Sequence, residues 1–452
     1  MKRPNVLLIS IDTLRADRLG CYGHPGGLTP NLDRIAEGGV RFSQAITGGS
    51  WTQAAFPVLL TSTYASMYAG CLGPLSPLRP SPVEAFSRAG YRTGGFSTSP
   101  LLSRRMGYAR GFEEFFDLES GDPDPLIRNL KVGHRLLLSP LVHRLSSAIG
   151  ANSRPARPYA PASHVVERVS HWVSAAAEPF LAWVHLMDAH WPYHLDEDVS
   201  DPKSIAGAWR DLRKMHRVNW KGDGLDGEQR KRFIDLYERA VQFVDAQVGL
   251  LLDHVDRAAR LDNTVIVVVS DHGEEFLERG HWGHVEINLH DEIIKVPLLI
   301  KLPGGSQART IEHQVRTLDI MPTLVDLCGI PEPGGMLGES LRPLWTQSSQ
   351  EQERIAICER WREQSHMIAV RTSSHKYIWD SQEPENPTLY DLVNDPDERK
   401  DVRAEQPEIA GSLSRHVNGQ LARMRSTWRG GSSEVDEDEA VVARLKDLGY
   451  IE

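Results

Sequence analysis

The chain has 452 residues, of which 40% are hydrophobic and 25% charged, and a formal net charge of −10 at pH 7. This composition is typical of a globular protein with room for one large domain and a smaller one. The negative charge argues against nucleic-acid binding, which requires a basic surface. No apolar run approaches the roughly 20 residues that span a bilayer, and the apolar stretch at residues 5–9 is too short for a signal-peptide core. The four cysteines show no paired spacing, which fits reduced thiols. We therefore expect no transmembrane segment and a cytoplasmic location.

Predicted strands and helices alternate along the first part of the chain. An uninterrupted apolar run at residues 6–11, which ends at Asp12, predicts a strand buried on both faces. Helical spacing and apolar runs then predict, in chain order, a helix at 32–38, a helix that begins near Thr52, a strand at 91–97, a helix at 165–177, a strand at 180–186, a helix at 231–258 and a strand at 264–270. This alternation predicts an α/β fold with a largely parallel central sheet.

Residues 1–350 are predicted to form this α/β domain, with two insertions at 123–161 and 196–226. The first insertion places basic residues among leucines, and the second is polar and contains tryptophan. The first insertion is either a surface cap over the active site or a docking surface for a membrane or a partner.

The chain changes character after about residue 350. Short strands at 355–358, 367–371 and 376–379, followed by a helix at 405–424, predict a small antiparallel subdomain over residues 351–428. Residues 429–452 begin with a Gly/Ser-rich and then acidic stretch, which predicts a linker and a terminal helix.

Two carboxylates follow predicted strands directly. Asp12 ends the first strand, and Asp271 follows the strand at 264–270 and is itself followed by His272. Ligands of open α/β sheets bind outside the carboxyl ends of the strands. A single aspartate at such a place is often only a helix cap, but two aspartates with a histidine form an oxygen and nitrogen ligand set. That set suits a divalent cation such as Zn²⁺, Mn²⁺, Mg²⁺ or Ca²⁺.

An ordered series of motifs spans nearly the whole chain. They are the opening stretch Asn5 to Gly23, Thr29-Pro-Asn-Leu-Asp33, Phe180 to Tyr193, Ser270-Asp-His-Gly-Glu274, Asp291-Glu292 with Val296-Pro-Leu298, Asp319 to Thr323, Leu389 to Pro396 and Arg444 to Tyr450. This series resembles the sulfatase family of the alkaline-phosphatase superfamily. The resemblance implies an alkaline-phosphatase-like sandwich and a metal-dependent enzyme acting on phospho- or sulfo-ester bonds.

Thr52 occupies the nucleophile position of the family pattern. Sulfatases carry Cys or Ser in a Cys/Ser-x-Pro-x-Arg motif that is converted to formylglycine, whereas this chain has Ala54 for the proline and Phe56 for the arginine. Oxidised threonine would be a ketone rather than the required aldehyde. Threonine is the nucleophile in phosphodiesterase-like and phosphoethanolamine-transferase-like relatives, so the resemblance favours that subtype. A metal stabilises the alkoxide that such a nucleophile requires.

The resemblance also assigns roles to the remaining polar residues. It implies metal ligation by Asp12, Thr52, Asp271 and His272, catalytic roles for Thr52, His190 and His284, and substrate contacts from His185, Arg15, His281 and Lys376. His281 competes with His284 for the same position, and the histidines are alternatively ligands of a second metal. Thr13 replaces the second aspartate that is usual at the first metal site, which favours Zn or Mn over Mg or Ca.

The resulting expectation is a hydrolase or transferase that cleaves a phosphoester of a small-molecule or conjugate substrate through a covalent Thr52 intermediate. Two alternatives stay open. In the first alternative, the chain is a sulfatase-like hydrolase of sulfuric esters that lacks formylglycine. In the second, it is a pseudoenzyme that binds an anion or a partner. The altered residues around Thr52 favour the pseudoenzyme, whereas the retained ligand set and nucleophile oppose it.

Overall fold

A large, mostly parallel sheet forms the centre of the computed structural model, which describes residues 3–68, 70, 73–118, 159–195, 202–221, 224–284, 288–305, 308–346, 353–362 and 365–427. In the described chain this sheet has eight strands, in the order β12 (Arg309–Ile311), β2 (Val40–Phe42), β11 (Leu298–Lys301), β7 (Thr264–Ser270), β1 (Asn5–Ile11), β6 (Phe180–Leu186), β4 (Arg92–Ser97) and β5 (Glu114–Asp117). β11 runs antiparallel to both of its neighbours, and the other pairs are parallel. The predicted α/β class is confirmed.

The three central strands set the position of the site. Every residue of β1, β6 and β7 is buried, as expected for strands covered on both faces. In the parallel register Ile11 pairs with Leu186 on one side and with Ser270 on the other. The carboxyl ends of the three strands therefore lie side by side, and the residues that follow them meet at one edge of the sheet.

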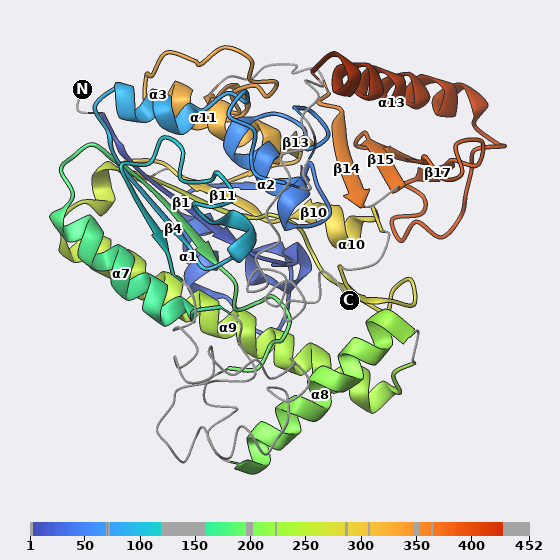
Figure 1. Cartoon of the computed structure of the whole chain (residues 1–452), viewed down its shortest axis with the longest axis horizontal. Helices are drawn as coiled ribbons and strands as arrows, with labels where there is room; N and C mark the ends of the chain where they lie inside the picture. Colours follow the sequence, from blue (N-terminus) through green and yellow to red (C-terminus); the bar gives the residue numbers. More distant parts are fainter. Residues whose placement is uncertain are drawn as a thin grey trace.

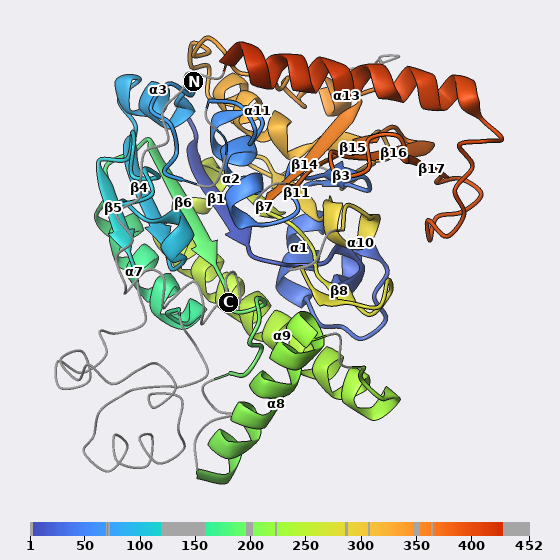
Figure 2. The same cartoon turned by 45° about the vertical axis from the view of Figure 1, so that its right-hand side comes forward.

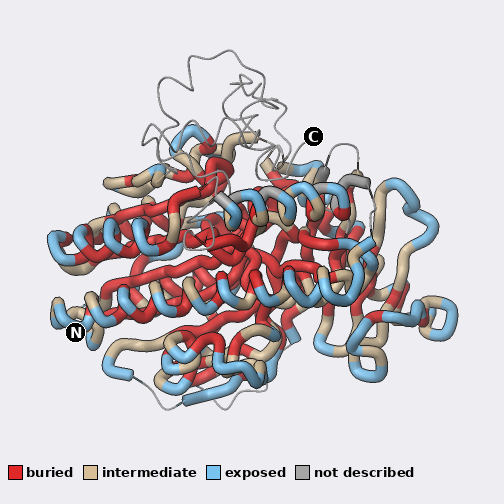
Figure 3. The backbone as a smooth tube through the Cα atoms, turned by 90° about the horizontal axis from the view of Figure 1, so that it is seen from below, coloured by how far each residue is buried: buried red, intermediate tan, exposed pale blue. Residues whose placement is uncertain are grey.

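Helices cover both faces of the sheet (Figure 1). One face packs against α1 (Pro30–Glu37), α7 (Ala162–Ala175) and the long α9 (Gly227–Arg257), and the other against α2 (Thr52–Thr61), α3 (Pro82–Arg88) and α11 (Ile320–Leu327). Figure 3 shows the buried strands running between helices whose outer sides are exposed. Two short helices, α10 (Asp291–Ile294) and α12 (Pro343–Thr346), belong to the same part. Two small sheets complete it: a three-stranded one in the order β10 (Lys295–Val296), β3 (Ala45–Ile46) and β13 (Val315–Arg316), and the pair β8 (Glu275–Phe276) and β9 (Trp282–Gly283).

The C-terminal region forms a second, antiparallel sheet. Its described strands are β14 (Ala356–Arg362), β15 (Ser365–Arg371), β16 (His375–Asp380) and β17 (Thr388–Asp391), and α13 (Pro407–Thr427) packs on it (Figure 2). The predicted antiparallel subdomain is confirmed, although β17 was not predicted. Glu359 of β14 also forms a parallel bridge with Gly49, so this sheet is hydrogen-bonded to the loop that precedes α2.

Three further expectations concern the insertions and the chain end. The segment 196–226 contains a helix, α8 (Pro202–Lys221), where only a polar insertion was predicted. Of the predicted insertion 123–161, residues 123–158 lie outside the described residues, as do 428–452 with the predicted terminal helix. Among the described helices, we find none whose length and apolar character would let it cross a membrane.

Candidate active site

Asp12, Asp271 and His272 meet where β1 and β7 end, and all three side chains are fully buried. His272 Nε2 lies 3.7 Å from Asp12 Oδ1 and 3.5 Å from Asp271 Oδ2. None of these three atoms has a hydrogen-bond partner among the described residues. Buried polar atoms are rarely left without a partner. Three such atoms facing one another, at separations close to those of ligands around one transition-metal ion, fit a divalent cation.

The surroundings of the three ligands support the same conclusion. His272 Nδ1 lies 2.9 Å from the Gly273 carbonyl oxygen, so Nδ1 must carry the proton and Nε2 keeps its lone pair, as in histidines that ligate metals. Burial lowers the pKa of His272 to about 3, which keeps the ring neutral. Burial and the charge of Asp12 raise the pKa of Asp271 well above its usual range. Without a cation the Asp271 carboxyl group therefore favours its protonated form, and a cation held between the two groups would favour the carboxylate.

Thr52 lies beside this triad as the first residue of α2. Its side chain is fully buried, and Oγ1 donates to Asp12 Oδ2 across 3.4 Å. The approach of the chain to α2 requires a glycine, because a Cβ on Gly49 would lie 2.3 Å from the carbonyl carbon of Ala54. Phe56, which replaces the family arginine, packs edge-on against His185 with ring centroids 4.9 Å apart. That position supplies core packing and no cation.

Two of the predicted catalytic histidines lie next to the triad. The His284 ring is 4.5 Å from the His272 ring and 4.9 Å from the His190 ring, between centroids. His284 Nδ1 lies 3.3 Å from Oε1 of the fully buried Glu274. His190 Nδ1 contacts the Trp191 carbonyl oxygen, and burial lowers the pKa of His190. His190 is therefore neutral, with its proton on Nδ1 and a lone pair on Nε2.

His185 and His281 differ from these two in position. The fully buried His185 lies between Ser10 and Asp12, with Nδ1 3.1 Å from Ser10 Oγ and Nε2 3.3 Å from Asp12 Oδ2. It supports a metal ligand instead of facing a substrate. The His281 side chain is exposed, and its backbone N–H donates to Glu275 Oε1. The structure thus brings His284, and not His281, into the cluster.

Arg15 and Lys376, the two predicted cationic contacts, are both neutralised by protein carboxylates. Lys376 is fully buried, with Nζ 2.6 Å from Asp291 Oδ1 and 2.7 Å from Glu398 Oε1. These ion pairs compensate the charge of Lys376, so its surroundings do not support the predicted substrate contact. Arg15 is paired at 2.8 Å with both Asp17 and Glu278.

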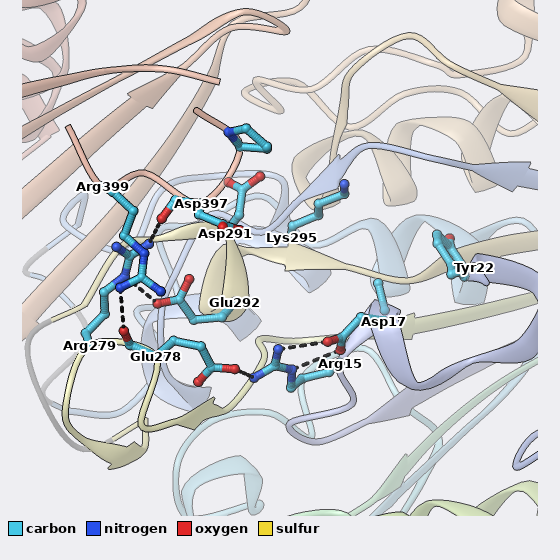
Figure 4. A pocket seen from close by; sticks show the side chains of 12 residues that line it. Arg15, Asp17, Tyr22, Glu278, Arg279, Asp291, Glu292, Lys295, Asp397 and Arg399 are labelled. Atoms are coloured by element: carbon cyan, nitrogen blue, oxygen red, sulfur yellow. Dashed lines mark hydrogen bonds and ion pairs between the residues drawn. The ribbon is translucent and has the colours of Figure 1, made fainter. Parts of the chain in front are cut away.

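Arg15 also lines a cavity of about 280 Å³, and most of the residues that line it are charged (Figure 4). The other side chains that line it include Asp17, Glu278, Arg279, Asp291, Glu292, Lys295, Asp397 and Arg399. Figure 4 shows the arginines of this cavity already bonded to neighbouring carboxylates and carbonyls. The contacts of Arg15 therefore do not support the predicted substrate contact.

Sequence reasoning missed two residues that the site uses. Glu274 was noticed only as part of a motif, yet burial raises its pKa to about 7 and its carboxylate contacts His284. Tyr237 lies in the middle of the long helix α9, where it has the pattern of a core residue. Only the fold brings its hydroxyl group to the residues that follow Asp12.

Comparison with known proteins identifies the family of the chain. A family model described as Sulfatase matches residues 4–330, and one described as N-sulphoglucosamine sulphohydrolase, C-terminal, matches residues 280–427. The chain is 25% identical to a Delta 4,5-hexuronate-2-O-sulfatase of Bacteroides thetaiotaomicron, over 97% of this chain and 92% of the relative.

Solved structures share the fold. A phosphonate monoester hydrolase of Agrobacterium radiobacter superposes with a TM-score of 0.71 at 21% identity, covering 93% of this chain and 96% of that one. A protein solved in complex with its substrate D-glucosamine-2-N,6-O-disulfate superposes with a TM-score of 0.72 at 17% identity, covering 97% and 100%. At these identities the likeness shows the fold alone. With a matching family model over most of its length, the chain belongs to the sulfatase family of hydrolases.

Proposed function

We propose that the chain is a metal-dependent hydrolase of a small anionic ester, with Thr52 as its nucleophile. The substrate class we place first is a sulfuric ester, and a phosphoric or phosphonic ester is the second candidate. One observation carries the proposal: three buried ligand atoms without partners face one another, and the Thr52 hydroxyl group is hydrogen-bonded to one of the same carboxylates.

Asp12 Oδ1, Asp271 Oδ2 and His272 Nε2 would hold the cation, with Thr52 Oγ1 beside them. When bound, a divalent cation lowers the pKa of an adjacent hydroxyl group and neutralises charge on the ester oxygens. The replacement of the usual second aspartate by Thr13 leaves two carboxylates and a histidine, a set that favours Zn²⁺ or Mn²⁺ over Ca²⁺.

The residues of the chain can then complete two displacements. Thr52 Oγ1, its proton lost to solvent, attacks the sulfur or phosphorus atom, and the bond to the leaving oxygen breaks. Protonated His284 donates the Nε2 proton to that oxygen, while Glu274 accepts from Nδ1. Water next attacks the same centre and gives its proton to the neutral Nε2 of His190. The bond to Thr52 Oγ1 breaks, and the inorganic anion is released.

The relatives and the nucleophile favour different substrate classes. The curated relatives include several sulfatases, which supports the sulfuric ester. Thr52 supports the phosphorus ester, because a threonine ester of phosphate is resolved by the same displacement that formed it, without an aldehyde. Phosphonate monoester hydrolases share the fold, so this scaffold accommodates both kinds of centre.

A matched substrate panel tests the proposal. The protein is stripped of metal, Zn²⁺, Mn²⁺, Mg²⁺ or Ca²⁺ is added back singly, and turnover is measured with p-nitrophenyl sulfate, p-nitrophenyl phosphate, bis-p-nitrophenyl phosphate and a phenylphosphonate monoester. Thr52→Ala is the control. Metal-dependent turnover of one class that disappears in Thr52→Ala supports the proposal and selects the class. Tight metal binding without turnover of any ester would instead favour the pseudoenzyme.

A further inference from the structure

The turn that follows Asp12 has a strained backbone. Thr13 has a φ of 55°, in the left-handed region, where a β-branched side chain is a genuine outlier. Such conformations persist only where surrounding contacts hold them, and they gather at functional sites. Thr13 directly follows one metal ligand, and its backbone N–H donates to a second, Asp271 Oδ1, at 3.3 Å.

Every backbone N–H of residues 12–15 has a partner from another element. Asp12 N donates to Leu186 O at 2.9 Å, Thr13 N to Asp271 Oδ1 at 3.3 Å, Leu14 N to Ser270 Oγ at 2.9 Å and Arg15 N to Tyr237 Oη at 2.9 Å. The Thr13 side chain adds a bond from Oγ1 to Ala189 O at 2.8 Å. The turn is therefore tied to β6, β7, α9 and the segment after β6.

Tyr237 makes two of the contacts with this turn through one atom. The fully buried Tyr237 hydroxyl group donates to the Thr13 carbonyl oxygen at 2.8 Å and accepts from Arg15 N, so it bridges the backbone on either side of Leu14 and fixes the carbonyl of the strained residue. Tyr237 belongs to the long helix α9, which packs on the sheet. If the turn relaxed, the Thr13 N–H would leave Asp271 Oδ1, and the orientation of that carboxylate would no longer be fixed.

We propose that Tyr237 is a positioning residue for the metal site: its hydroxyl group holds the turn at Thr13 in its strained form and so keeps Asp12 and Asp271 in ligating geometry. The inference rests on the metal site of the proposed function, and it does not depend on which ester is cleaved. Removal of a residue that orients a metal ligand typically lowers metal affinity by about 10- to 100-fold.

Metal affinity without substrate is the test. Tyr237→Phe keeps the ring and removes both hydrogen bonds. Tyr193→Phe is the matched control, because Tyr193 is also fully buried, its ring lies 5.4 Å from Tyr237, and its hydroxyl group bonds Trp282 Nε1 instead of the turn. We expect Tyr237→Phe to weaken Mn²⁺ binding by calorimetry, and Zn²⁺ binding by chelator competition, by about 10- to 100-fold. Tyr193→Phe should lower the melting temperature about as much as Tyr237→Phe does. It should change the metal affinity by less than about twofold.

Repeating Tyr237→Phe in a Thr13→Gly protein shows whether its effect comes from backbone strain at Thr13 or only from the loss of a hydrogen bond. Thr13→Gly accepts a positive φ without cost, so Tyr237→Phe should weaken metal binding clearly less in Thr13→Gly protein than in the natural sequence. The proposal is overturned if Tyr237→Phe lowers the melting temperature and leaves both metal affinities unchanged. It is also overturned if the effect has the same size in both backgrounds, or if the natural protein binds neither metal. Failure to cleave any ester while these affinity changes hold would count against the proposed function alone.

Discussion

Two buried groups of charged side chains in this protein differ in how their charges are compensated. Around Lys376, each charge meets an opposite one: Nζ lies 2.6 Å from Asp291 and 2.7 Å from Glu398, and Arg371 Nη2 lies 2.8 Å from Asp291. Around Asp12, two carboxylates and neutral His272 leave three buried atoms without partners among the described residues. The ion pairs around Lys376 link α10 to strands β15 and β16 of the C-terminal sheet. The atoms without partners around Asp12 are instead available to a cation.

The largest effect is expected at the nucleophile. Thr52→Ala should lower kcat/KM by roughly 10⁴-fold or more, because loss of a covalent nucleophile removes the whole double-displacement route. Thr52→Ser, which keeps a hydroxyl group, should retain measurable turnover. Steady-state kinetics on the ester selected by the substrate panel checks both variants. Equal activity of Thr52→Ala and the natural protein would show that another group attacks the ester.

Asp271→Asn acts on the incompletely compensated cluster. It removes the charge of a direct ligand. Removal of a residue that only orients a ligand already lowers metal affinity by about 10- to 100-fold, so here the affinity should fall by at least about 10³-fold. The metal-free protein should be about as stable as the natural one, because the raised pKa of Asp271 keeps its carboxyl group protonated without metal, and an amide of the same shape replaces it. Metal titration and thermal unfolding of the metal-free protein measure the two effects. A marked loss of stability without metal would contradict the distinction between the clusters.

Lys376→Met should show the opposite pattern. Asp291 keeps its partner Arg371, but Glu398 stays buried without the cation nearest to it, which typically costs about 3–5 kcal/mol of unfolding free energy. Metal affinity should stay close to that of the natural protein, because Lys376 contacts none of the three ligands. Urea denaturation and metal titration separate the outcomes. Loss of metal binding with unchanged stability would show that Lys376 acts in the active site.

The smallest effect is expected at Glu274. Glu274→Gln removes the negative charge that favours protonated His284, so esters with poor leaving groups should slow by about 10- to 100-fold. Esters with good leaving groups need little proton donation and should slow much less. A series of aryl esters with phenols of rising pKa measures this difference. A uniform loss across the series would assign Glu274 a structural role.

The sequence predicted the parts of the molecule that depend on local pattern. Buried apolar runs predicted β6 and β7 with their bounds, and the residues after β1 and β7 predicted the three buried side chains that lie close enough to hold a metal ion. The antiparallel β11 was not predicted, because its four residues resemble any short apolar run. Nor does local pattern show that Lys376 is neutralised by Asp291, 85 positions earlier, or that Tyr237 reaches Thr13. Such pairings depend on tertiary structure.

A covalent intermediate on Thr52 is the most direct test of the central claim. The natural protein and Thr52→Ala, each loaded with the metal that supports turnover, are mixed with the best substrate and quenched in acid within the first turnovers, and their peptides are mapped by mass spectrometry. The structure predicts a sulfuryl or phosphoryl group on Thr52 of the natural protein and no adduct in the variant. An adduct on another residue, or continued turnover by Thr52→Ala, would contradict Thr52 as the nucleophile.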